Sequence, residues 1–210
     1  PRFGAEDALA LHRALLIDSL GLVGRVSQAS EAQGLLYLSE ARDLDGEMEA
    51  HLDGCTVRAQ QGADLGERLM HAFQECFDTG YREVLVLGSD SPHLPEAYVR
   101  RGFEELQRTD LVVGPARDGG YYLLGATRLF QDLLTDMRWG TAEVYRETVR
   151  RARKAGISIA SLPAWYDVDL PEAVTRLWQD LTSQRDHDER PLAEATLSLL
   201  DAWARQGKLS

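Results

Sequence analysis

The chain has 210 residues, 44% of them hydrophobic and 27% charged, and its 34 acidic and 23 basic side chains give a formal net charge of -11. This length and composition are typical of one globular domain with a sizeable core. The acidic balance excludes the basic stripe that a nucleic-acid surface needs, and it repels anionic small molecules over long range. A bound nucleotide diphosphate would therefore need a divalent cation beside it.

Two further features bear on where the chain acts. No apolar run approaches the roughly 20 residues that cross a bilayer, and no secretory signal is recognised. Cys55 and Cys76 lack the spacing of a metal site. The simplest interpretation is a bacterial-type cytoplasm with reduced thiols, and a single disulfide is the alternative.

Helical and strand patterns alternate along the chain. Residues 6–23 carry leucines at helical spacing, at positions such as Leu11, Leu15 and Leu20. Strands are then predicted at 35–38, 55–57, 84–87, 111–113, 121–124 and 157–159, with helices near 45–52, 64–78, 95–108, 142–155 and 171–182. Apolar strands separated by helices predict an α/β fold, a three-layer α/β/α sandwich, whose ligands bind beyond the carboxyl ends of the strands.

The end of the chain has a different composition. Residues 1–183 are predicted to form the main domain, and residues 184–190 have almost no apolar content, which indicates a polar linker. Residues 191–210 carry Leu197, Leu200 and Trp203 at the spacing of an amphipathic helix. This helix is expected to dock on the domain or on a second copy in a homodimer.

Asp90 follows the apolar strand 84–87, in the sequence GSDSP. A turn with a helix cap is one explanation, because these residue types dominate such places. Its position at the end of a strand favours a ligand contact instead, since Mg²⁺ and Mn²⁺ prefer carboxylate oxygens. Ser89 in the same turn is assigned to nucleotide or substrate binding.

Asp167 and Asp169 form a second carboxylate group. Asp169 fits a helix cap, with Glu172 completing a capping box. The two aspartates also alternate as strand residues do, so that both can face one side. Asp90 and one of this pair are therefore predicted to share one ion.

The segment 113–125 is rich in glycine and contains Asp118, Gly119, Gly120 and Tyr121. Asp-Gly-Gly between two apolar runs is typical of a hairpin. The density of glycines favours backbone that approaches a ligand closely. Asp118 and Tyr121 are then expected to border the pocket, with the two glycines against the substrate.

Two more segments carry candidate binding residues. Gln60 ends a strand and could contact a nucleobase edge, while Asp64 either caps the next helix or binds the ligand. Trp139 and Thr141 precede another helix, and Trp139 is suited either to the core or to a substrate wall that meets a sugar.

Five segments occur in one order: DLGERL, VLVLGSDSPHL, DLVVGPARDGGYYLLG, RWGTAEV and YDVDLPE. In that order they resemble a bacterial family of GT-A-type glycosyltransferases, some assigned to arsenosugar biosynthesis, over about residues 1–182. They are more distantly similar to guanylyltransferases of molybdenum-cofactor and phospholactate metabolism. The resemblance implies a nucleotide-diphospho-sugar transferase fold with a mixed sheet. It also implies Mg²⁺ or Mn²⁺ at Asp90, helped by Asp167 or Asp169.

One departure from that family concerns phosphate binding. Its members begin with a central strand and a loop of the type Pro-x-x-Gly-x-x-Lys-Thr-Arg-Leu, whereas residues 1–6 here correspond to the positions just after it. The sheet is therefore expected to lack the usual first strand, through a truncated start or a real loss. Candidates for the phosphate contact are Arg58, Arg68, Arg117 and Arg138.

The leading hypothesis is a metal-dependent glycosyltransferase that moves a sugar from a nucleotide-diphosphate donor to a small-molecule acceptor. In this hypothesis Asp118 contacts the acceptor hydroxyl and is a candidate general base. The alternatives are a nucleotidyltransferase that uses the same ion, and a catalytically inactive binding or scaffolding protein that lacks the phosphate loop.

Overall fold

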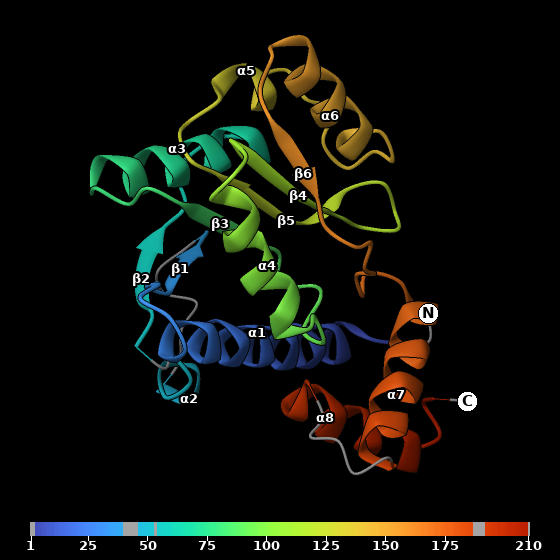
Figure 1. Ribbon diagram of the computed structural model, residues 1–210. Coiled ribbons are helices and arrows are strands. Elements are labelled where there is room, and N and C mark those ends of the chain that lie inside the picture. Colours follow the sequence, from blue (N-terminus) through green and yellow to red (C-terminus); the bar gives the residue numbers. More distant parts are fainter. Residues whose placement is uncertain (1–2, 40–45, 53, 187–191, 210) are drawn as a thin grey trace.

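The computed structural model describes residues 3–39, 46–52, 54–186 and 192–209. Fourteen elements follow one another in this part of the chain (Figure 1). The helices are α1 Ala5–Gln28, α2 Gly46–Glu49, α3 Leu65–Asp78, α4 Glu96–Leu106, α5 Gln131–Leu134, α6 Val144–Lys154, α7 Pro171–Asp186 and α8 Glu194–Arg205. The strands are β1 Leu35–Leu38, β2 Thr56–Ala59, β3 Val84–Leu87, β4 Leu111–Pro115, β5 Tyr121–Ala126 and β6 Ile159–Ser161.

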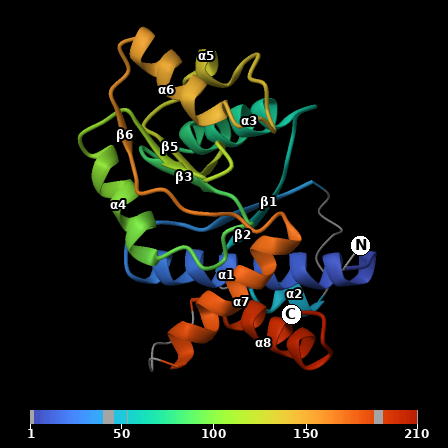
Figure 2. The ribbon, with the colours of Figure 1, turned by 90° about the vertical axis from the view of Figure 1, so that its right-hand side faces the viewer.

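The predicted three-layer sandwich is confirmed (Figure 2). Side chains of α3, α5 and α6 form one core cluster with β4 and β5, around Phe73 and Val113. Side chains of α1 and α4 form a second cluster on the other face, around Val99, Val112 and Tyr122. Neighbouring residues of β4 point to opposite faces, so Val112 and Val113 enter different clusters. Helix α5 was not predicted, because its four residues are too few to show helical periodicity.

The sheet is mixed and lies in two parts. β1 pairs in parallel with β2, and a four-stranded sheet has the order β3-β5-β4-β6. β5 is antiparallel to β3 and β4, whereas β6 is parallel to β4. The strands β4 and β5 form the hairpin that the Asp-Gly-Gly sequence predicts, with a register shift between Gly114 and Pro115.

β1 and β3 belong to the same layer without pairing to each other. Both contact α3, β1 through the hydrogen bond of Tyr37 to Glu75. A hydrogen bond from Tyr81 to Gln33 joins the chain just ahead of the two strands. Both strands consist of apolar residues except for Tyr37, yet they are only half-buried, whereas most of β4 and β5 is buried. Within the described residues, no strand joins β1 to β3.

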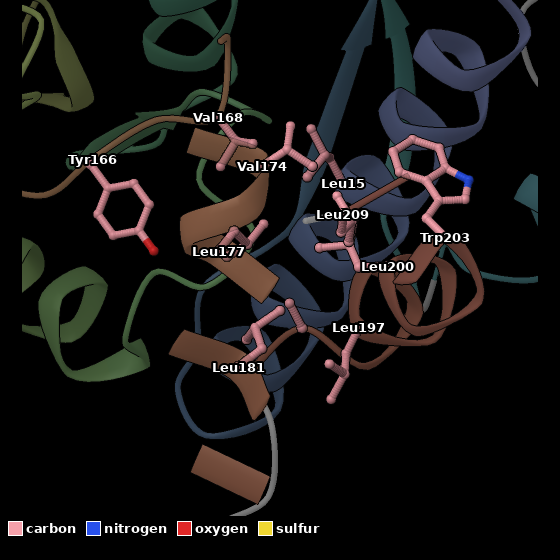
Figure 3. Close-up of a cluster of buried hydrophobic side chains, with 11 residues drawn as sticks. Leu15, Tyr166, Val168, Val174, Leu177, Leu181, Leu197, Leu200, Trp203 and Leu209 are labelled. Atoms are coloured by element: carbon pink, nitrogen blue, oxygen red, sulfur yellow. The ribbon is translucent and has the colours of Figure 1, made fainter. Parts of the chain in front are cut away.

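The C-terminal helix docks on this same chain. α8 packs against α1 and α7, and its side chains share a core cluster with them that includes Leu15, Leu177 and Trp203 (Figure 3). The carboxylate of Asp18 accepts hydrogen bonds from the N–H groups of Ala195 at 3.0 Å and Thr196 at 2.7 Å. A buried carboxylate of α1 thus binds the amino end of α8.

The linker prediction for 184–190 is wrong at its start. Residues 184–186 continue α7, while residues 187–190 lie outside the described residues. The three-residue error arises because a solvated helical turn and a linker have the same polar composition. The division into a main domain and an appended helix stays a prediction. Within the described part of the chain, no helix is both long and apolar enough to span a bilayer.

Candidate functional site

Asp90 lies in the turn at the carboxyl end of β3. The backbone of Gly88 still donates to Tyr122 of β5 at 3.1 Å, and the chain then leaves the sheet. The hydroxyl of Ser19, on α1, shares its one hydrogen between the carbonyl of Leu15 at 2.8 Å and the carbonyl of Ser89 at 3.3 Å. The Ser89 hydroxyl donates to the Asp90 carboxylate at 3.3 Å. The turn is therefore held from the sheet and from α1.

The segment that carries Asp167 and Asp169 lies directly beside this turn. The N–H of Val168 donates to the carbonyl of Asp90 at 2.8 Å, and the hydroxyl of Ser91 donates to the carbonyl of Tyr166 at 3.1 Å. These two hydrogen bonds join segments that are far apart in the sequence. They place the backbone of Asp90 against the 166–168 segment, as the shared-ion prediction requires.

Asp167 and Asp169 face one side, although they are not in a strand. Tyr166 and Val168 are buried in the cluster beneath α7 (Figure 3), whereas Asp167 is half-buried and Asp169 is exposed. The predicted cap at Asp169 is absent: in the described residues, no first-turn N–H of α7 bonds its carboxylate, and the carbonyl of Leu170 accepts instead. The Asp169 carboxylate therefore does not cap the amino end of α7.

The hairpin loop brings Asp118 to the same place. The N–H of Arg117 donates to the carbonyl of Trp165 at 3.0 Å, which fastens the loop to the segment ahead of Tyr166. Asp118 accepts from the N–H of Gly120 through one carboxylate oxygen, at 2.8 Å. Its other oxygen has no bond to the chain among the described residues.

Four carboxylates meet at this end of the sheet. Burial raises the pKa of Asp167 above its ordinary value, and the charges of Asp118, Asp169 and Asp90 raise it further. This repulsion means that Asp118, Asp169 and Asp90 each lie close enough to Asp167 for their charges to act on it. An uncompensated carboxylate group of this kind attracts a cation.

The donor set fits a hard divalent ion held partly by substrate. Within the residues that the structure describes, no three His, Cys, Asp or Glu side chains converge as ready metal ligands. Mg²⁺ is usually bound by one or two carboxylates, several waters and substrate phosphates rather than by an all-protein cage. Asp90 with Asp167 or Asp169 would offer the one or two carboxylates of such a shell, and this metal site stays a prediction.

The predicted nucleotide-side residues Gln60 and Asp64 lie between β2 and α3. Asp64 caps this helix, accepting from the N–H of Glu67 at 2.9 Å, while the Glu67 carboxylate accepts from the N–H of Ala63 at 2.7 Å. The capping alternative for Asp64 is therefore realised. The amide of Gln60 donates to the carbonyl of Tyr37 at 3.4 Å and accepts from Arg68 at 3.3 Å. The chain itself holds both polar atoms of the Gln60 side chain.

Trp139 and Tyr121 connect the start of α3 to the hairpin loop. Their rings meet edge to face, with centroids 6.2 Å apart. A β-carbon at Gly66 of α3 would lie only 2.8 Å from Nε1 of Trp139, so the indole passes tightly over the helix start. The Thr141 hydroxyl donates to the carbonyl of Arg138 at 2.8 Å and closes the turn ahead of α6.

Two glycines of the hairpin are also required by packing within the fold, and the predicted contact of Gly119 and Gly120 with a ligand stays a prediction. Gly119 has a φ of 96°, and a β-carbon there would lie 2.2 Å from the carbonyl oxygen of Ala142. At Gly114 it would lie 2.3 Å from the Tyr122 ring. At Gly120 the three atoms nearest to such a β-carbon all belong to Asp118, the first of them at 3.2 Å.

An aromatic group that the sequence did not indicate packs behind the carboxylates. The imidazole of His93 lies 4.3 Å from the Tyr166 ring and 5.2 Å from the Trp165 ring, measured between centroids. Burial lowers the pKa of His93 to about 4, and neither ring nitrogen has a partner among the described residues. No local signal distinguishes this buried histidine, because its neighbours in the sequence resemble any turn.

Comparison with known proteins shows the family and the fold of the chain. Residues 22–141, more than half of the chain, match the family described as "Uncharacterized protein conserved in bacteria (DUF2064)". The chain belongs to this family. The DUF2064 match includes Gln60, Asp64, Asp90, Asp118 and Trp139, and it ends before the 167–169 segment.

Two relatives of this DUF2064 protein extend the comparison. A candidate nucleotide-diphospho-sugar transferase from Desulfovibrio desulfuricans G20, known from a crystal structure, is 35% identical, with a TM-score of 0.79 over 93% of this chain and 84% of its own. The 2-phospho-L-lactate guanylyltransferase of Methanothermobacter thermautotrophicus is 24% identical over 168 residues, 79% of this chain and 69% of its own length. The fold is that of the nucleotide-diphospho-sugar transferases.

Proposed function

We propose that this protein is a transferase that uses a nucleotide-diphospho-sugar donor and a divalent metal ion, Mg²⁺ or Mn²⁺, to glycosylate a small-molecule acceptor. The observation that carries the proposal is the contact of Asp90 with the 166–168 segment, where burial raises the pKa of Asp167 and the charges of Asp118, Asp169 and Asp90 raise it further. The candidate sugar-nucleotide transferase of the same fold supports it, at 35% identity over most of both chains.

In this proposal, different residues bind the metal ion, accept the proton and contact the sugar or base. Asp90, Asp167 and Asp169 would hold the ion, which when bound supplies positive charge to the departing nucleotide diphosphate. Asp118 has one carboxylate oxygen fixed by Gly120 and one left over, so it can accept a proton from an acceptor hydroxyl without losing its place. Trp139 offers an aromatic face to a sugar or base.

A nucleotidyltransferase is the second candidate. The guanylyltransferase relative favours it, and the same carboxylates would then serve attack by an acceptor phosphate on a nucleoside triphosphate. Incubation with labelled nucleoside triphosphates and with sugar nucleotides separates the two. Sugar transfer without pyrophosphate release supports the proposal, whereas pyrophosphate release without sugar transfer supports the second candidate.

The direct test of the site is Asp90→Asn. We expect Mn²⁺-dependent binding of nucleoside diphosphates, measured by calorimetry, to weaken at least tenfold, because the amide cannot replace a carboxylate ligand. The melting temperature should change little, since the structural bonds of this turn use backbone groups and serines.

The matched control is Glu104→Gln, which removes one carboxylate from the exposed side of α4. It should leave binding and melting temperature unchanged. If Asp90→Asn lowers the melting temperature strongly while nucleotide affinity persists, Asp90 is only a turn residue and the proposal fails. If the unaltered protein binds neither Mn²⁺ nor nucleotide, the scaffolding alternative prevails.

A further inference from the structure

Arg117 is a positive charge without a carboxylate partner at the edge of an acidic site. Its side chain is exposed, and no Asp or Glu oxygen in the described part of the chain lies within 4.0 Å of its guanidinium. The guanidinium carbon lies 5.8 Å from the centre of the Tyr166 ring. Asp118, the next residue in the sequence, belongs to the carboxylate group, and Tyr166 directly precedes Asp167, another member of that group.

Other arginines of the molecule are committed to ion pairs. Arg176 also lies over the Tyr166 ring, at 4.2 Å, but Asp180 pairs with it at 3.6 Å, and Asp180 also accepts from the Tyr166 hydroxyl. On α6, Arg146 and Arg150 pair with glutamates one turn away. Arg117 thus differs from these arginines in having its five N–H donors available.

The backbone of Arg117 is fixed although its side chain is exposed. Its N–H bonds Trp165, and Ala116 forms a bridge with the same residue, so the loop cannot swing away from the 165–167 segment. The Tyr166 ring beneath the guanidinium is itself held by His93 and Asp180. A planar cation stacked near a fixed ring is preorganised for an anion.

The charge of the whole molecule makes such a contact useful. An anionic small molecule approaches a protein of net charge -11 against long-range repulsion. At the site itself it meets four carboxylates, which a bound divalent ion neutralises only in part. A fork of guanidinium donors beside Asp118 offsets this repulsion locally and recognises a carboxylate or phosphate in two hydrogen bonds.

We infer that Arg117 is a specificity-determining residue that binds an anionic group, a phosphate or a carboxylate, on the acceptor substrate. The inference rests on the proposed function in that it places the acceptor beside Asp118. It restricts the acceptor to small molecules that carry such a group near the reacting hydroxyl.

The test uses inorganic phosphate and malonate as probes, titrated into the ¹⁵N-labelled full chain in EDTA without nucleotide. We expect saturable amide shifts at residues 117–120, with a dissociation constant on the order of millimolar. Arg117→Ala should weaken that affinity about tenfold, and Arg117→Lys should weaken it less, because lysine keeps the charge without the fork.

The matched control is Arg128→Ala. Arg128 follows the opposite end of β5, stacks over Phe130 at 4.9 Å and lies 4.0 Å from an oxygen of Asp110, so this variant loses the same charge and a similar ring contact, together with one weak ion pair, away from the site. It should keep the affinity of the unaltered chain. Equal losses in both variants would mean general charge attraction, and an unchanged affinity in Arg117→Ala would mean that Arg117 binds no anion. Either result overturns the inference.

The probes and one more variant separate the remaining outcomes. Tighter binding of phosphate or of malonate upholds the inference and decides which anion the acceptor carries. Asp90→Asn should retain phosphate affinity in EDTA, because this measurement needs no metal. If the unaltered chain binds phosphate but binds no nucleotide in the presence of Mn²⁺, the proposed function fails while the anion site at Arg117 stands.

Discussion

At the scale of single residues, the raised pKa of Asp167 means that this site lowers the free energy of unfolding at neutral pH. Burial and three neighbouring carboxylates raise its pKa, so the folded protein holds a proton there more tightly than the unfolded chain does. As pH rises from the ordinary aspartate value through the raised one, stability therefore falls, and the full loss is present above the raised pKa. At a pH below the pKa of Asp167 in both the folded and the unfolded state, this loss of stability disappears.

Asp167→Asn should consequently raise the melting temperature at pH 7 while it weakens Mn²⁺ binding. The gain is expected to be about 1 kcal/mol or less, because solvent screens a half-buried group, and this corresponds to about 2–4 °C at most. Thermal unfolding at pH 7 and at pH 3 checks the sign, with Glu104→Gln as the charge-matched control. A gain that persists at pH 3, or a loss at pH 7, contradicts the repulsion.

At the scale of elements, Asp64 at the start of α3 can act as a helix cap or as a ligand contact. The carboxylate of Asp64 closes the first turn of the helix together with Glu67. The indole of Trp139 passes over the same turn, beside Gly66. Any change that loosens this cap also moves the surface that Trp139 lies on, so loss of binding alone does not prove that Asp64 contacts a ligand.

Asp64→Ala and Asp64→Asn separate the two roles. The alanine variant should lose about 1 kcal/mol in urea unfolding, because it removes the acceptor for the Glu67 N–H. The asparagine variant keeps an acceptor oxygen and should stay within about 0.5 kcal/mol of the unaltered chain. If the asparagine variant is equally stable yet binds nucleoside diphosphates more weakly, the charge of Asp64 acts on the ligand.

At the scale of the whole molecule, the C-terminal helix is part of the packed fold. Asp18 on α1 binds the amino end of α8, while Trp203 on α8 stacks on Phe3 with ring centroids 5.0 Å apart. α1 also holds the Asp90 turn through Ser19. One helix therefore contacts both the candidate site and the C-terminal helix.

Asp18→Ala should lower the free energy of unfolding by about 2–3 kcal/mol, because two N–H groups of α8 lose their acceptor at a buried position. Amide hydrogen exchange in the Asp18→Ala variant should speed up more in α8 than in β4, relative to the unaltered chain. The Glu104→Ala variant should change neither the free energy of unfolding nor the exchange rates. An Asp18→Ala protein as stable as the unaltered chain would show that α8 is held by apolar contacts alone.

Much of the fold could be predicted from the sequence, since strand and helix periods are local properties. The strand ahead of Asp90, the hairpin at Asp118 and the outward pair of Asp167 and Asp169 depend on residues a few positions apart. The roles of capping residues were less predictable. Asp64 and Asp169 precede helices in the same way, but packing and chain direction make only the first a cap.

The sequence by itself determined the α/β class, the acidic charge, and which ends of the strands carry carboxylates, because hydrophobic period and turn chemistry act over short stretches of chain. Only the tertiary structure decided that Asp90 touches the 166–168 segment, that Arg117 lies near Tyr166 without a carboxylate, and that α8 closes on α1. These contacts join residues far apart in the chain. They depend on how the layers pack, which no local pattern encodes.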